Sequence, residues 1–178
     1  AGTITSVVDV DQHPLSVAFT NGANQFHTVY IPAGVTLSND NALNVGVATV
    51  IDANLTTVWF AGPGTLFQKG NMTVRNNSAG QGASLSLATL DLSSLTNFVY
   101  TNSSGTIAIS GTGSETRAGG ALTLAGGSNN IVAATINFNT TSGNVGNNAG
   151  SVFKLGLGTN IINVGNLNVV AGKVTSGT

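Results

Sequence analysis

The chain has 178 residues, of which only 6% are charged, and its formal net charge at pH 7 is −1. Because soluble proteins typically contain about 25% charged residues, Asn, Thr, Ser and Gly must cover most of this surface. The few Lys and Arg residues are scattered, which excludes the clustered positive charge of a nucleic-acid-binding surface. The absence of Cys excludes disulfides and thiolate metal sites, and no apolar run is long enough for membrane insertion.

The first 31 residues differ from the rest of the chain. They are richer in acidic, His and aromatic residues and have no clear counterpart later in the sequence. Terminal units of repeat arrays are often atypical, so residues 1–31 are predicted to form an N-terminal cap or an atypical first coil. Residues 32–178 are predicted to form the repeats, and the final phrase, which stops within a repeat, indicates a fragment of a longer chain.

Short β-strands are predicted along most of the chain, and helix signals are nearly absent. Apolar residues alternate with Ser, Thr, Asp, Ala, Gly or Asn, which places the apolar side chains on one face of each strand. Gly- and Asn-rich turns separate the strands. The alternating pairs are at 85–87, 90–92, 107–109, 122–124, 136–138, 155–157 and 167–169, and the turns are at 102–105, 126–130, 140–144 and 147–150.

A repeat of about thirty residues indicates how these strands are arranged. Residues 122–139 and 155–172 share a phrase that aligns Asn130 with Asn160, so stacked coils would place these two amides in a ladder. The fold class predicted is therefore an all-β parallel β-solenoid, with a β-sandwich as the alternative. Further matches align 135–138 with 166–169 at an offset of thirty-one, 32–41 with 62–71 (Leu37 with Phe67), and 88–94 with 134–140.

Three phrases, "ATLDLSSLTNFVYTNSSGTIAIS", "LTLAGGSNNIVAATINFN" and "LGLGTNIINVGNLNVVAGKVTSGT", resemble bacterial surface proteins with autotransporter-associated β-strand repeats. The resemblance covers about residues 85–178, with a weaker echo at 31–76. It implies a right-handed β-solenoid outside the bacterial cell, with a scaffolding or adhesive role of the kind found in passenger regions of surface antigens.

Acidic residues are the candidates for metal binding and acid–base chemistry. Asp9 and Asp11 are predicted on one side of a strand, a spacing that suits a Ca²⁺ site or a catalytic pair. A Ca²⁺ ion needs six or more oxygen ligands and no further carboxylate is close in sequence, so a solvated face without metal or cofactor is expected. Asp40, Asp52 and Asp91 are too widely spaced to predict a polysaccharide-cleaving groove, and we expect no enzymatic activity.

The remaining ionisable side chains are predicted to be structural or solvent-facing. His13 and His27 are expected to make surface polar contacts rather than to activate a Ser nucleophile. Glu115 and Arg117 are expected to form an exposed ion pair that contributes less than about 1 kcal/mol.

Aromatic residues are concentrated in the first half of the chain. Exposed rings would stack on sugar faces, and Trp59 and Tyr30 are then the candidates for a glycan-binding strip. Buried rings would fill a wider core, and the imperfect alternation around Trp59, Phe60 and Phe67 favours this second interpretation.

The sequence thus predicts an extracellular structural or adhesive β-solenoid of a bacterial surface protein. Its alternatives are a self-assembling filament or surface-layer subunit, a glycan-binding module and, less favoured, a polysaccharide lyase or hydrolase. The partners expected are other copies of the chain or of its parent surface protein, together with host or environmental glycans.

Overall fold

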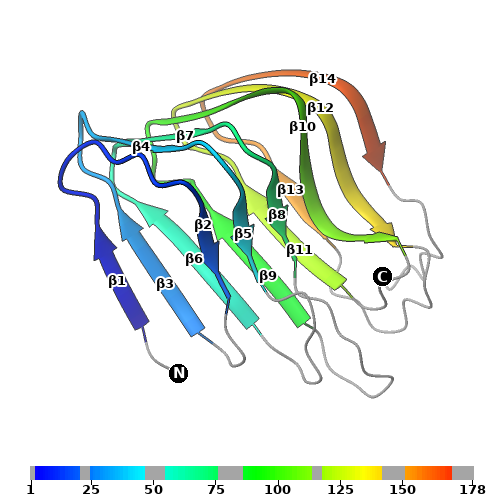
Figure 1. Ribbon diagram of the computed structural model, residues 1–178, viewed down its shortest axis with the longest axis horizontal. Helices are drawn as coiled ribbons and strands as arrows, with labels where there is room; N and C mark the ends of the chain where they lie inside the picture. Colours follow the sequence, from blue (N-terminus) through cyan, green and yellow to red (C-terminus); the bar gives the residue numbers. More distant parts are fainter. Residues whose placement is uncertain are drawn as a thin grey trace.

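The computed structural model describes residues 3–20, 25–46, 55–75, 86–113, 118–141 and 151–169. These residues form β-strands and no helix, and every strand pairing among them is parallel. Successive coils stack along one axis, with the first and last coils at opposite ends (Figure 1). The prediction of a parallel β-solenoid is confirmed.

The first sheet receives one strand from each coil. Its six strands follow the order β1-β3-β6-β9-β11-β13. They are β1 (Thr3–Val7), β3 (Gln25–Tyr30), β6 (Leu55–Ala61), β9 (Ser86–Asp91), β11 (Ala118–Thr123) and β13 (Val152–Lys154).

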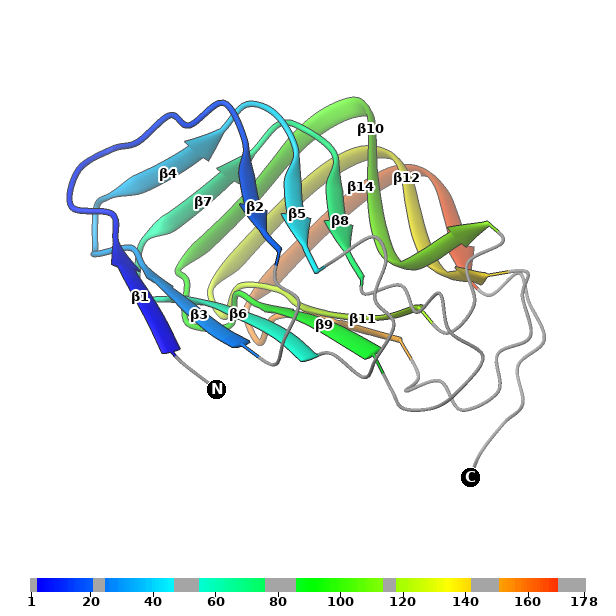
Figure 2. The same cartoon turned by 60° about the horizontal axis from the view of Figure 1, so that its bottom comes forward.

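The second sheet bends around the other side of the coil (Figure 2). In the early coils it consists of short strands: β2 (Val17–Phe19), β4 (Thr36–Asn39), β5 (Leu43–Val45), β7 (Thr65–Gln68) and β8 (Met72–Val74). In the later coils these become single long strands: β10 (Asn97–Gly113), β12 (Ser128–Thr141) and β14 (Thr159–Val169). The first part of β10 pairs with β7 and a later part with β8, so one bent strand continues two straight ones.

The first coil belongs to the same two sheets as the later coils. β1 pairs with β3, β2 pairs with β5, and an isolated bridge joins Gln12 to Leu37. The segment 1–31 therefore contains the first coil and also β3, the first strand of the second coil.

The repeat is a stacking period, but its length varies from 29 to 32 residues. The thirty-one-residue match of 135–138 with 166–169 is confirmed by the pairing of β12 with β14. The match of Asn130 with Asn160 is wrong by one residue: Asn129 pairs with Asn160, and Asn130 pairs with Ile161. The sequence offered both alignments because Asn occupies both 129 and 130, and the turn length selects the first.

Two earlier matches also need correction. Leu37 pairs with Leu66 rather than with Phe67, because this coil is 29 residues long. Residues 88–91 lie in the first sheet and 134–140 in the second, so the likeness of 88–94 to 134–140 does not reflect stacking.

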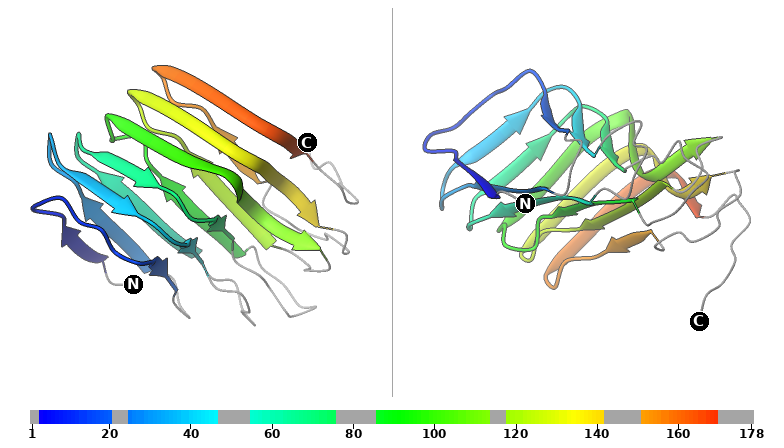
Figure 3. Two further views of the ribbon diagram at one scale, coloured as in Figure 1. Left: turned by 45° about the horizontal axis from the view of Figure 1, so that its top comes forward. Right: turned by 90° about the horizontal axis from the view of Figure 1, so that it is seen from below.

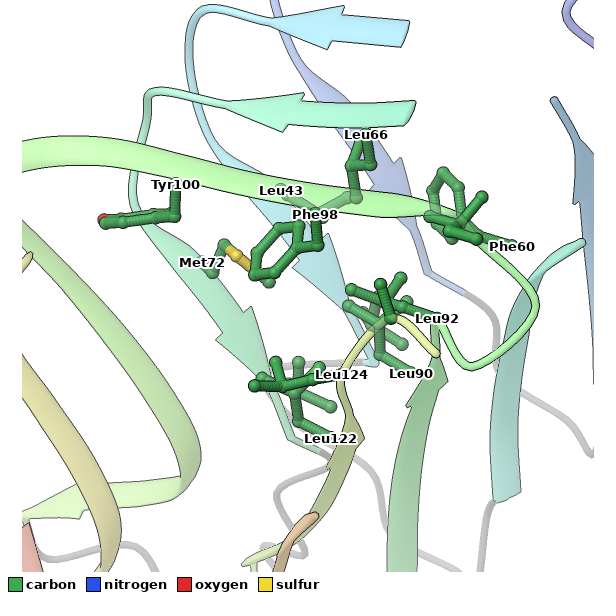
Figure 4. Packing of buried hydrophobic residues seen from close by; sticks show 14 of the residues in the cluster. Leu43, Phe60, Leu66, Met72, Leu90, Leu92, Phe98, Tyr100, Leu122 and Leu124 are labelled. Carbon is green, nitrogen blue, oxygen red and sulfur yellow. The ribbon is translucent and has the colours of Figure 1, made fainter. Parts of the chain in front are cut away.

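The core consists of apolar columns that run through the coils. In the first sheet Val58, Leu90 and Leu122 follow one another in register, and all three are fully buried. They face Phe98 and Met72 of the second sheet across the interior (Figure 4). Equivalent positions in neighbouring coils lie about 4.8 Å apart, so each side chain packs against those above and below it.

Polar side chains are also buried, at the corner between the short strands of the second sheet. Asn39 and Gln68 pair in register, and Asn39 Nδ2 donates to Gln68 Oε1 at 2.7 Å. Gln68 Nε2 also donates to the carbonyls of Asn41 (2.6 Å) and Gly70 (2.8 Å). The chain bends here, which turns carbonyls away from the ladder, and buried carbonyls need donors. These amides supply them.

Tyr100 occupies the same column in the next coil, since it pairs with Gln68. Its hydroxyl donates to the carbonyl of Thr106 at 3.4 Å, across the bulge in β10 that follows Asn102. Burial raises the pKa of Tyr100 to about 12. The phenol thus performs in the long strand what an amide performs in the short ones.

This burial predicts an alkaline titration. In a Tyr30→Phe variant Tyr100 is the single tyrosine, and its phenolate absorbance should appear with a midpoint near pH 12. The unfolded chain loses this proton near pH 10, so raising the pH from about 10 to about 12 should lower the free energy of unfolding. A Tyr100→Phe variant should lose less stability over this range. A phenolate midpoint near 10 would contradict the burial of the hydroxyl.

Candidate functional site

The outer face of the first sheet displays three aromatic side chains from two adjacent strands. Phe26 and Tyr30 extend from β3 with exposed fractions of 45% and 41%, and Trp59 extends from β6 with 44%. Trp59 pairs with Thr28, which lies midway between Phe26 and Tyr30. The three rings therefore lie around one threonine on a flat face, and we call Phe26, Tyr30 and Trp59 the aromatic face.

Polar groups surround the indole of Trp59. Its Nε1 donates to Ser94 Oγ at 3.1 Å, which directs the ring toward the turn after β9. Asp91 is the register partner of Trp59 on β9, and its carboxylate accepts the backbone N–H of Ser93 at 2.8 Å. An apolar ring is thus placed beside a carboxylate and hydroxyl groups.

The preference for a core role of the aromatic residues is right for Phe60 and wrong for Trp59 and Tyr30. Phe60 is fully buried and meets Phe19 edge to face, at a centroid distance of 6.0 Å. Strand alternation sends Trp59, next to Phe60, to the opposite face. Phe67 is half-buried. Phe26, which the sequence reasoning did not select, joins the outward rings because it lies two residues before Thr28.

The asparagine ladder exists, and its inner member is Asn129. Its Oδ1 accepts the N–H of Ala125 (2.9 Å), and its Nδ2 donates to the Ala125 carbonyl (2.8 Å) and to Asn160 Oδ1 (3.0 Å). Asn160 repeats the arrangement one coil later, with the N–H (3.1 Å) and carbonyl (2.9 Å) of Gly156. Each amide closes its own turn, and one bond joins the two coils, so this site is structural.

The carboxylates of Asp9 and Asp11 are exposed, but they do not lie on a strand as the sequence predicted. Both belong to the connection after β1. Asp11 Oδ1 accepts the backbone N–H of Thr36 at 2.7 Å and so joins the first coil to the second. Within the described part of the chain, no three His, Cys, Asp or Glu side chains are grouped so that they could hold a metal ion.

The two histidines have different surroundings. His13 is exposed, whereas His27 is half-buried in the interior row of β3, with its ring 5.5 Å from that of Phe19. The expectation of a surface contact is therefore wrong for His27, because strand alternation turns it inward.

An open groove of about 440 Å³ lies beside the polar corner. Lys69 Nζ donates to Asp40 Oδ1 at 2.6 Å, and this hydrogen bond lowers the pKa of Asp40 below its ordinary value. Both side chains are nearly half exposed, so the ion pair contributes little stability. The amide oxygen of Asn71 is already bonded, to the N–H of Thr106. The groove is lined by Ser16, Asp40, Asn41, Ala42, Lys69, Gly70, Asn71 and Asn102.

The acidic residues selected from the sequence are not brought together. Asp40 lies at the groove and Asp91 on the outer face of the first sheet. Asp52, Glu115 and Arg117 lie outside the described residues.

Comparison with protein-family models, with curated proteins and with solved structures finds no match to this chain. In the described residues no helix is long and apolar enough to cross a membrane.

Proposed function

We propose that this protein is a structural β-solenoid scaffold, acting without catalysis or cofactor at the outside of a bacterial cell. The observation that carries the proposal is the continuous core: apolar columns such as Val58–Leu90–Leu122 run through successive coils without interruption. Each coil shares its interior and its backbone hydrogen bonds with both neighbours, so bending the stack would break many contacts at once.

The low charge of the chain supports the same role. In-register stacking places equivalent side chains about 4.8 Å apart, where a repeated charge would repel itself. Hydroxyl and amide side chains avoid this repulsion and add bonds between coils. Asn97 Nδ2 donates to Thr65 Oγ1 at 3.2 Å, and Asn168 Nδ2 to Asn137 Oδ1 at 2.8 Å.

Deleting one coil tests the scaffold role. Removing residues 128–158 joins Gly127 to Thr159, the register partner of Ser128, so β14 takes the place of β12. A scaffold should remain folded, unfold cooperatively and still be displayed. Antibodies against the folded chain should label intact source cells before permeabilisation, with a cytoplasmic protein as control. Labelling only after permeabilisation, or loss of display on removing this coil, would contradict the proposal.

The aromatic face favours a second candidate function, which is glycan binding. Sugar rings present C–H groups on one face and hydroxyl groups at the rim. The exposed rings of Tyr30 and Trp59 suit the first, and the side chains of Thr28, Asp91 and Ser94 suit the second.

A glycan array followed by titration calorimetry tests this second function. Trp59→Ala should weaken binding of any glycan ligand by about tenfold, because the largest ring of the face is lost. The matched control is Leu55→Ala, which removes an exposed aliphatic side chain from the same face of β6. Equal affinities of Trp59→Ala and the original protein would exclude the aromatic face as the site.

A further inference from the structure

The two ends of the solenoid are open sheet edges that expose core positions. β13 and β14 end the two sheets on one side, and β1 and β2 end them on the other (Figure 3). Leu167 and Val169 of β14 are 59% and 56% exposed, although Ile136, the register partner of Leu167 in the preceding coil, is fully buried. These side chains are exposed because no coil covers them, and we call the two surfaces the N-terminal and C-terminal faces.

The same columns connect one face with the other. The column that ends at Leu167 begins at Val17, and the column that ends at Val169 begins at Phe19. Both columns are therefore apolar at both ends. The first runs Val17–Leu43–Met72–Ile107–Ile136–Leu167, and the second Phe19–Val45–Val74–Ile109–Phe138–Val169.

A third column is polar at both ends. It begins at Gln12, passes through an apolar middle and ends with the ladder of Asn129 and Asn160. Asn129 gives one amide hydrogen bond to the next coil, whereas Asn160 directs its Nδ2 to the carbonyls of Gly156 and Gly158 within its own coil. An amide placed above Asn160 would continue the ladder, and Gln12 is the amide that this column presents at the N-terminal face.

The charges of the two faces are opposite. The described residues of the first coil, 3–20, include Asp9 and Asp11 and no Lys or Arg. Those of the last coil, 151–169, include Lys154 and no acidic residue. Opposite potentials orient two approaching surfaces and disfavour contact between like faces.

From these matched columns and charges we propose that the C-terminal face binds the N-terminal face of a second copy of this chain. The second copy adds β1 beside β13 and its residues 10–19 beside β14, so unpaired edge strands acquire parallel partners. A contact between two different faces leaves one of each free at the ends of the pair, and it propagates into an open filament. The contact deepens the proposed scaffold role, because it extends the same stack from one chain to the next.

Sedimentation velocity and negative-stain imaging of the full chain test this contact. The mass should rise with protein concentration, and long stacks should appear. Leu167→Asp places an unpaired charge in the interface, opposite an acidic face, and should weaken association roughly 100-fold. Because Leu167 is exposed in the single chain, its circular dichroism should not change; Val169→Asp is the second variant of the same face. The matched control, Leu55→Asp, alters an exposed leucine on the lateral surface and should associate like the original protein.

A mixing experiment distinguishes head-to-tail from other contacts. Ile4→Asp blocks the N-terminal face at a side chain that is 52% exposed. Ile4→Asp and Leu167→Asp chains should each remain monomeric and together form a one-to-one dimer that grows no further. An original chain that stays monomeric at all concentrations, association unchanged by Leu167→Asp, or a mixture without dimers would overturn the inference. A surface-displayed monomer would overturn this contact alone, whereas a stacking protein found inside cells would overturn the proposed location alone.

Discussion

Replacing Phe98 by Ala should lower the free energy of unfolding by about 3–5 kcal/mol, the range found for buried Phe truncations. Phe98 is fully buried in β10, at the middle of the stack, between Leu66 of one coil and Asn129 of the next (Figure 4). The cavity would remain largely empty because backbone ladders fix the coils on both sides at the strand spacing. The loss is measured by denaturant unfolding, with Trp59 fluorescence as the probe.

The control for this prediction is Phe26→Ala, which removes the same ring from the outer face of the first sheet. Phe26 is 45% exposed and has no coil packed over its face, so the cost should stay below about 1 kcal/mol. Equal losses for the two variants would show that the interior between the sheets is not close-packed.

Replacing Asn129 by Ala should cost about 2–4 kcal/mol. The substitution leaves the N–H and the carbonyl of Ala125 without their partners and removes the bond to Asn160 Oδ1. Asn129 is fully buried, so water does not replace these bonds, and each unsatisfied buried group costs about 1–3 kcal/mol. Thermal and denaturant unfolding of the variant measure the loss.

Asn137→Ala is the matched control for the buried ladder. Asn137 accepts one bond from Asn168 Nδ2 on the exposed side of the same two strands, and water replaces that bond after truncation. Its cost should therefore be below about 1 kcal/mol. A loss at Asn137 as large as that at Asn129 would contradict the closing role assigned to the buried amide.

The strands and their stacking were predictable because both depend on side-chain periodicity. Alternation of apolar and small polar residues fixes which side of each strand is buried, and a recurring phrase fixes which strands are neighbours. The match of 135–138 with 166–169 gave the correct register of β12 and β14. In the match of Asn130 with Asn160 the adjacent Asn129 fitted equally well, and the turn from Ala125 decides between them.

The candidate sites were less predictable. Trp59 and Phe60 are consecutive, so one had to face inward and the other outward, and composition alone did not say which. The polar corner formed by Asn39 and Gln68 was missed, because its purpose is to satisfy carbonyls that turn inward only after the chain bends.

By itself the sequence determined that the chain stacks: alternation supplies an inner face, the repeat supplies neighbours, and low charge permits equivalent side chains to lie one strand spacing apart. Only the tertiary structure decided the register of Asn129, the outward direction of the aromatic face and the matching of the two ends. The reason is that these features depend on coil length and bend positions. A shift of one residue exchanges the two faces of a strand while it leaves the composition of the segment unchanged.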